Sequence, residues 1–273
     1  MSNGPIGQPS PLATPEPWDL VAADYTAEAL PFFELFAREA LRLAALPEGA
    51  RIVDVAAGPG TLSLLAAAAG ARVSAIDISE GMVAAFRTRA EAAGLAEAID
   101  IHLGDGQTLP FESAAYDGAF SMFGLMFFPD RIAGLREMRR VLRPGGLAVV
   151  SSWVPFEGPF GELLRTAREM IPSLPFGGGR PPLADPDEVR SELTAVGFGD
   201  VRVETVDHQL TAPSFDAFWD MMERTNAPLV LLKHRLGQRW ADAAPTIRSR
   251  VRATLGDGPL VVGRGAYLGI GVA

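Results

Sequence analysis

The feature that most constrains this chain is an alternation, beginning at Arg51, of short apolar runs with stretches of helical periodicity. Such alternation is typical of βαβ units and predicts a parallel sheet covered by helices. Seven strands are expected, near 51–56, 72–77, 99–103, 116–121, 146–152, 200–206 and 265–272. Helices are expected near 60–69, 79–93, 130–142 and 186–196. The predicted fold class is therefore α/β, with a doubly wound, mainly parallel seven-stranded sheet.

The segments before and within the later part of this alternation differ from it in composition and periodicity. Residues 1–17 hold five prolines among glycine, serine and asparagine, and we expect a disordered tail. Apolar residues recur at helical spacing over 18–46, which predicts an N-terminal helical cap. The core is expected over 47–209, with its final strand in 263–273. The helical stretch 210–262 is too long for a hairpin connection and is interpreted as a lid inserted into the core.

Composition narrows the classes of partner. The 273 residues are 48% hydrophobic with a formal net charge of −9, so the chain lacks the basic surface that nucleic acids require. No apolar run approaches the roughly 20 residues that span a bilayer, and no secretory signal pattern opens the chain. We expect a cytoplasmic protein with a small-molecule partner, while homo-oligomerisation stays open. The absence of cysteine excludes thiolate chemistry.

The segment 52–61, Ile-Val-Asp-Val-Ala-Ala-Gly-Pro-Gly-Thr, runs from an apolar strand through a turn of small residues into a helix. Small residues let a ligand approach the backbone, and the helix N-terminus suits an anionic group. Dinucleotide-binding turns prefer Gly-x-Gly-x-x-Gly, but Ser63 stands where the third glycine would be. The pattern therefore weakens an NAD interpretation.

Two further polar positions follow strand ends. Asp77 ends the second predicted strand, seventeen residues beyond Gly60, where an acid can accept hydrogen bonds from ribose hydroxyls. Gly104-Asp105-Gly106 follows the third strand.

Asp54, Ala56, Gly58 and Gly60, with Asp77 and Gly104-Asp105-Gly106, resemble in order and spacing the motifs of class I, Rossmann-like S-adenosylmethionine (SAM)-dependent methyltransferases. Alanine stands at the first glycine position of their motif. The resemblance implies SAM as cofactor, with the turn against its methionine part and Asp105 near the adenine. It implies the following cofactor-binding residues: Tyr25, Asp54, Ala56, Gly58, Gly60, Asp77, Ile78, Met82, Gly104, Asp105, Gly106 and Ser121. Ordinary core packing is the alternative for Met82, and half-buried packing for Tyr25.

The segment after the fourth strand separates subclasses. It lacks the Asn/Asp-Pro-Pro-Tyr motif of amide and adenine methyltransferases. It resembles the ubiquinone- and natural-product-type small-molecule enzymes, whose His-His-hydrophobic-Pro-Asp run aligns with 126–130. Met126 and Phe127 replace both histidines. This tilts the expectation slightly toward carbon or nitrogen acceptors and away from simple O-methylation.

By the family's topology, several apolar residues surround the methyl-transfer end of the cofactor and predict a dry aromatic pocket for the acceptor. These residues are Phe123, Met126, Phe127, Trp153, Phe156, Trp219 and Met222. Since SAM is already reactive, alignment of the acceptor can supply much of the rate.

The candidates for a catalytic base are Tyr25, His208 and His234, and the sequence does not choose among them. None of the three histidines has metal-ligand spacing, and no metal is expected. His102 lies in a predicted strand and is interpreted as structural. An NAD(P)-dependent oxidoreductase would need a proton relay such as Tyr-x-x-x-Lys, which is absent. A SAM-binding protein without transferase activity fits the same motifs and stays an alternative.

Overall fold

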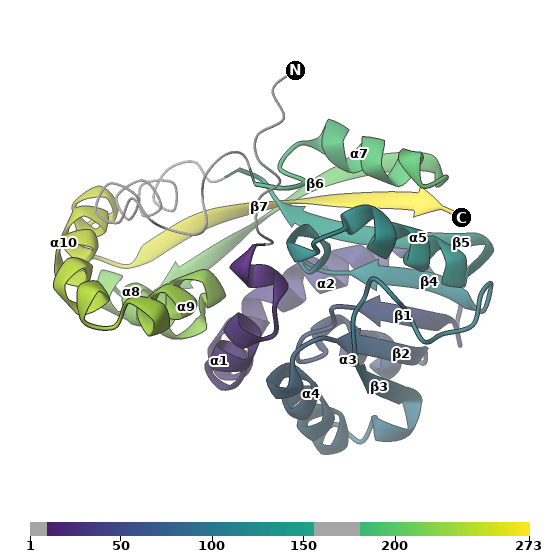
Figure 1. Cartoon of the computed structure of the whole chain (residues 1–273), viewed down its shortest axis with the longest axis horizontal. Helices are drawn as coiled ribbons and strands as arrows, with labels where there is room; N and C mark the ends of the chain where they lie inside the picture. The colour runs from purple at the N-terminus through teal and green to yellow at the C-terminus, as the bar shows by residue number, and fades with distance from the viewer. Residues whose placement is uncertain (1–9, 156–180) are drawn as a thin grey trace.

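The computed structural model describes residues 10–155 and 181–273 (Figure 1). Their centre is one seven-stranded sheet with the order β3-β2-β1-β4-β5-β7-β6. The first five strands run parallel, whereas β7 is antiparallel to both β5 and β6. Their bounds are β1 Arg51–Val55, β2 Arg72–Asp77, β3 Ile99–Leu103, β4 Tyr116–Ser121, β5 Leu142–Trp153, β6 Gly199–Ala212 and β7 Leu260–Val272. The predicted α/β class and the mainly parallel seven-stranded sheet are confirmed.

Helices cover both faces of the sheet, because the inner strands are apolar on both sides. One face packs against α3 (Thr61–Ala68) and α4 (Glu80–Ala92), and the other against α5 (Arg131–Val141) and α7 (Pro186–Ala195). The chain changes direction between β1 and β4, which are neighbours in the sheet. In open α/β sheets, ligands bind beyond the carboxyl ends of the strands at such a switch point. The motif residues lie at this edge.

The N-terminal segment is more ordered than its proline content suggested. The expected disorder of 1–17 is wrong for residues 10–17, which contain a 3-10 turn over Pro11–Ala13 and the start of α1 (Glu16–Asp24); residues 1–9 lie outside the described part. Prolines here occupy first turns of helices, where their missing N–H costs nothing. A π-turn over Tyr25–Ala29 then leads into α2 (Leu30–Ala44).

The helical insertion is shorter than 210–262, because both flanking strands extend into that range. β6 continues to Ala212 and β7 begins at Leu260, and the two stay paired to their ends. From Val206 to Ala212 the side chains of β6 alternate between half-buried and exposed, so a period-two pattern continues beyond the predicted end at 206. The insertion consists of α8 (Phe215–Thr225), α9 (Ala227–Leu236) and α10 (Gln238–Leu255), which sit at the far end of these long strands (Figure 1).

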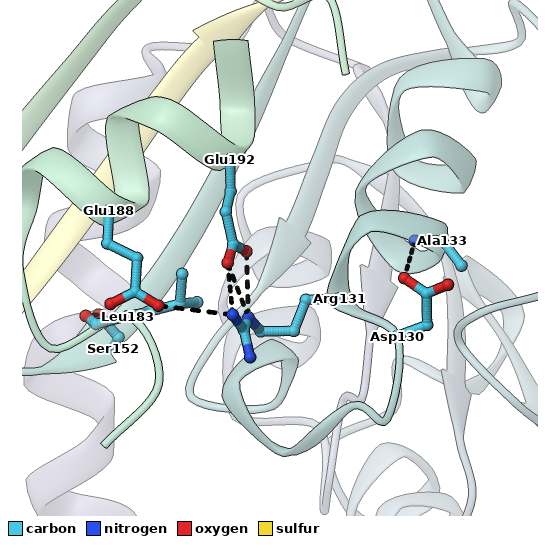
Figure 2. A network of polar contacts seen from close by, with 7 residues as sticks. All are labelled: Asp130, Arg131, Ala133, Ser152, Leu183, Glu188 and Glu192. Carbon is cyan, nitrogen blue, oxygen red and sulfur yellow. Dashed lines mark hydrogen bonds and ion pairs between the residues drawn. The ribbon is translucent and has the colours of Figure 1, made fainter. Parts of the chain in front are cut away.

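Polar contacts join α7 to α5 and the segment before α7 to the sheet (Figure 2). The guanidinium of Arg131, at the start of α5, pairs with the carboxylates of Glu188 and Glu192 on α7. The hydroxyl of Ser152 on β5 donates to the carbonyl oxygen of Leu183 at 2.6 Å. These contacts hold α7 and residues 181–185, which precede it, against the core.

Candidate functional site

In the turn between β1 and α3, one glycine faces empty space and another is packed against a neighbouring helix. Gly58 has φ +55°, and a Cβ built there would meet nothing within 4 Å. Gly60 has φ +77°, but its Cβ would lie 2.1 Å from the ring of Phe86, so packing against α4 requires this glycine. Gly58 is therefore the position at which the backbone is bare toward open space, as a ligand cradle requires.

Alanine at position 56 is accommodated by a glycine opposite it. Ala56 has φ +58°, a left-handed backbone conformation that residues other than glycine rarely adopt. A Cβ built on Gly124, which follows β4, would lie 2.3 Å from the Cβ of Ala56. The space between positions 56 and 124 therefore holds one methyl group, that of Ala56, and has no room for a second.

This complementarity predicts a double-mutant result. Gly124→Ala should destabilise the protein by about 1–3 kcal/mol, because two methyl groups overlap while the backbone at Gly124 (φ −97°) tolerates alanine. Ala56→Gly in the same chain should restore most of that loss. Urea unfolding of the single and double variants measures the coupling. Additive effects would show that the two positions do not compete for space.

Two buried carboxylates face this turn. The Asp77 carboxylate accepts the N–H of Gly58 at 2.7 Å and that of Ser79 at 2.9 Å. Asp54 is 1% exposed, and the hydroxyl of Ser63 donates to it at 2.7 Å. Ser63, the residue that departs from the dinucleotide pattern, is therefore the partner of Asp54.

Neither carboxylate has a basic partner among the residues that the structure describes. Burial raises the pKa of Asp54 to about 7, and the negative charge of Asp77 adds to the rise while the Ser63 hydrogen bond opposes it. Burial also raises the pKa of Asp77, against the hydrogen bonds from the Ser79 and Gly58 backbone. Asp19 of α1 adds to that rise, and its own carboxylate accepts from Ser79 Oγ and the Gly81 N–H. The site is suited to a cation and to hydroxyl donors.

Exposed apolar side chains flank Asp77 at the sheet edge. Ile78 is 37% exposed, and Leu103, which pairs in register with Asp77, is 50% exposed. Asp105 is exposed nearby and holds the backbone and side-chain nitrogens of Gln107. A flat heterocycle could lie on this apolar edge with polar groups at its rim. The sequence did not predict Leu103, since an apolar strand residue gives no signal of its exposure.

The other expected residues of this site divide into two groups. Gly104 and Gly106 are packing glycines, since an added Cβ would lie 3.0 Å from Ile76 and 2.5 Å from Phe128 respectively. Ser121, at the end of β4, is fully buried, and its hydroxyl has no hydrogen-bond partner in the described structure. A buried hydroxyl without a partner is rare in proteins, and a ligand group can supply one.

Tyr25 and Met82 lie between the N-terminal cap and the core. Met82 is 2% exposed and packs with Val21, Ala22 and Ala227, so the structure gives it the packing role that was the alternative. Tyr25 packs against the same cluster. Burial, and then the charge of Asp77, raise the pKa of the Tyr25 phenol above its ordinary value of 10. A raised pKa keeps the phenol protonated at neutral pH, which does not favour the role of base considered for it.

An aromatic cluster of Phe33, Phe36, Phe123 and Trp153 lies beside the turn. The rings of Phe123 and Trp153 stack with centroids 4.0 Å apart, and Phe36 packs edge-on against both at 5.3 and 5.5 Å. Phe123 has φ +59°, a strained conformation held by a 2.8 Å hydrogen bond from its N–H to Ser151 Oγ. Phe33 and Phe36 come from α2 and were missed because a helix of the cap carries them.

The acceptor residues expected from sequence do not form one group. Met126 is 8% exposed in the same core as Phe123, and Phe127 packs against that core with its ring centroid 5.0 Å from that of Trp18 of α1. The prediction that Trp219 and Met222 contact the acceptor is wrong. Both lie in the separate core of the helical insertion, where Trp219 is 2% exposed and stacks on Phe215. An amphipathic helix needs such a core, so its apolar residues gave no evidence of a ligand. Phe156 lies outside the described residues.

The three histidines occupy different environments. His102 is bonded to Asp100 at 2.7 Å, and His234 is exposed on α9. His208 on β6 packs edge-on against Phe36 with centroids 4.7 Å apart, and its Nε2 atom is buried. Within the described ranges, no group of histidine and acidic side chains is arranged to hold a metal ion, and no helix is long and apolar enough to cross a bilayer.

Comparison with known proteins agrees with this geometry. Residues 53–150 match the family model described as a methyltransferase domain. An uncharacterized protein of Mycobacterium bovis is 40% identical over 129 residues, 47% of this chain and 46% of its own length. The demethylmenaquinone methyltransferase of Thermus thermophilus is 38% identical over 145 residues, 52% of this chain and 64% of its own. The alignment with the first of these relatives thus spans about half its length.

The fold extends the likeness over almost the whole chain. The crystal structure of the cyclase SpnF superposes with a TM-score of 0.61 over 97% of this chain and 98% of its own, at 20% identity. A likeness at this identity concerns the fold alone. Residues 53–150 match a methyltransferase domain, and the chain around them shares the Rossmann-like α/β fold of the solved structure that it resembles.

Proposed function

We propose that the protein is a SAM-dependent methyltransferase that acts on a small, largely apolar or aromatic acceptor. The observation that carries this proposal is the pair of buried carboxylates, Asp54 and Asp77, beside a bare turn and without a basic partner in the described structure. SAM carries a sulfonium, an ammonium and two ribose hydroxyls, which are the groups that such carboxylates attract. When bound, SAM supplies an electrophilic methyl group.

The residues present fit this cofactor. The turn of Ala56, Gly58 and Gly60 would lie against its methionine part, and Asp77 would accept from the ribose. Ile78 and Leu103 would contact the adenine, with Asp105 at its rim. The unpartnered hydroxyl of Ser121 supports a ligand at the end of β4, where a polar ligand group would satisfy it. Tyr25 would close the methionine end from above.

The aromatic cluster would hold the acceptor, because it lies next to the turn through the Ala56–Gly124 contact. Stacked and edge-on rings favour a flat apolar compound. The name of the Thermus thermophilus relative describes a methyltransferase acting on demethylmenaquinone, which supports small-molecule methylation here. Replacement of both motif histidines by Met126 and Phe127 tilts the proposal slightly toward carbon or nitrogen acceptors.

Calorimetry separates this function from its alternatives. Titration with S-adenosylhomocysteine (SAH) should show one site, and titration with NADH should show none. Equal binding of both would refute the proposal in favour of an oxidoreductase. A mass-spectrometric search for products gaining one methyl group then separates an enzyme from a SAM-binding protein without turnover.

The cap and the helical insertion would act together as a lid. Arg224 of α8 pairs with Glu28 at 2.8 Å, and Arg235 of α9 pairs with Glu16 at 2.6 Å. Since these exposed pairs add little stability, the contact can open. We expect SAH to slow amide hydrogen exchange in α1 and over Tyr25–Ala29. Exchange that does not respond to SAH in either segment would remove the lid.

A further inference from the structure

The imidazole of His208 carries a polar atom that the fold leaves without a partner. Its Nε2 is buried, and within 10–155 and 181–273 only Ser121 Oγ shares this state. Leaving a buried polar atom unpaired costs free energy, and native proteins rarely tolerate it without a reason. Ser121 lies at the proposed cofactor site. His208 lies on the other side of the aromatic cluster, beyond the residues that would contact the cofactor.

Strand register places His208 on one face with two other side chains. His208 pairs directly with Arg264 across β6 and β7, and Trp153 of β5 pairs with Ala266 of β7. Directly opposed residues of antiparallel strands project to the same face, as do residues two apart on one strand. Trp153, His208 and Arg264 therefore share a face. The guanidinium of Arg264 lies 4.3 Å from the centroid of the Trp153 ring, which agrees with this register.

One aromatic ring packs directly on the imidazole of His208 and links it to the aromatic cluster. Phe36 packs edge-on against His208 at 4.7 Å and against Trp153 at 5.5 Å. Phe123, stacked on Trp153, is the residue next to Gly124, which touches the motif turn at Ala56. The chain of contacts thus runs from the turn, through the aromatic cluster, to His208. A flat ring held against this cluster could present one polar substituent to Nε2.

We propose that Nε2 of His208 binds a hydroxyl group of a planar, conjugated acceptor. This inference rests on the proposed function and adds to it the polar group by which the acceptor is recognised. A hydroxyl both donates and accepts, so it can pair with Nε2 in either imidazole tautomer, which a carbonyl or an ammonium cannot do. The neighbouring guanidinium of Arg264 further favours oxygen over a protonated amine, since two cations on one face repel.

Burial around Arg264 strengthens the electrostatic side of this argument. Removal from water lowers the pKa of its guanidinium to about 9, although the group stays charged at neutral pH. A positive charge in a poorly solvated place attracts oxygen lone pairs more strongly than one in water. An acceptor hydroxyl at Nε2 of His208 would share its face of the sheet with this cation.

The experiment compares matched ring compounds on the full chain saturated with SAH. The probes are 2-naphthol and naphthalene, and phenol and benzene. We expect each hydroxylated ring to bind at least about ten-fold more tightly than its parent hydrocarbon, the effect of one hydrogen bond to a buried group. His208→Phe should reduce that preference to within about two-fold, while His208→Gln, which keeps a hydrogen-bonding amide, should retain much of it. His234→Phe is the matched control and should leave it unchanged.

Nitrogen-15 spectra of the three imidazoles add a readout that does not depend on affinity. Addition of 2-naphthol should shift the Nε2 resonance of His208 and leave those of His102 and His234 in place. Equal binding of the alcohols and hydrocarbons by the wild type, or a preference that survives His208→Phe, would overturn the hydroxyl site. SAH affinity is measured first on every variant. Failure of the wild type to bind SAH would instead overturn the proposed function.

Discussion

Asp77→Ala is expected to weaken SAH binding by roughly 2–4 kcal/mol, about 30-fold to almost 1000-fold in Kd. The carboxylate would accept from two ribose hydroxyls, and it also orients the turn through the Gly58 N–H at 2.7 Å. Both contributions disappear in alanine. Calorimetric titration of the variant with SAH measures the loss.

The stability of the unliganded variant identifies the origin of this effect. Asp77 is a buried carboxylate whose pKa is raised by burial, so its removal also removes an unfavourable charge. The free energy of unfolding should therefore change by only about 1 kcal/mol. Asp100, an exposed carboxylate on neighbouring β3, offers the matched control, since Asp100→Ala should alter neither quantity. An unchanged SAH affinity in Asp77→Ala would place the ribose elsewhere.

The parts of the site that the sequence predicts are those set by local pattern. Apolar strands ending in Asp54 and Asp77, and the turn between 56 and 60, need only a few neighbouring residues to be recognised. Parallel pairing then brings their carboxyl ends together at one edge, because strand direction leaves no other arrangement. The cofactor side of the site is therefore predictable from sequence alone.

The acceptor side depends on contacts between segments far apart in sequence. Phe36 from the cap meets Trp153 from β5 and His208 from β6, and no local pattern encodes this meeting. Trp219 shows the converse: it is aromatic and lies in the insertion, yet it fills a separate core. Apolar residues look alike in sequence whether they face a ligand or another helix, so tertiary packing decides between the two.

Exposure and strain are equally difficult to predict from sequence. Leu103 and Ile78 are apolar strand-end residues whose partial exposure becomes visible only when the edge of the sheet is assembled. Ala56 and Phe123 both have a left-handed backbone conformation. The sequence does not indicate it, because only glycine marks such positions by residue type. Such conformations persist where the surrounding structure over-determines them, and they gather at functional sites. Here both border the proposed methyl-transfer region.

Stability of the unliganded protein should fall as the pH rises from about 4 to 7, and Asp54 should account for much of the change. Its pKa is raised by burial from 3.8 to about 7 in the folded chain. Between these values the native state holds a proton that the unfolded state has released. The stabilisation is fully present below pH 3.8 and is lost as the pH passes through about 7, a difference of about 4 kcal/mol.

Asp54→Asn isolates this contribution, because asparagine keeps the shape and a hydrogen-bonding partner for Ser63 but does not titrate. Urea unfolding of both proteins at pH 4, 5.5, 7 and 8 should show the wild type losing about 4 kcal/mol relative to the variant, and parallel curves would contradict the assignment. A bound cation should reverse the trend, since it favours the ionised carboxylate. SAM should therefore bind the wild type more tightly as the pH rises toward 7, whereas its affinity for Asp54→Asn should rise less, because only Asp77 still titrates there. Rising pH thus lowers the stability of the free protein and raises its affinity for SAM. Both trends are expected of a buried carboxylate whose ionised form is stabilised by a cationic ligand.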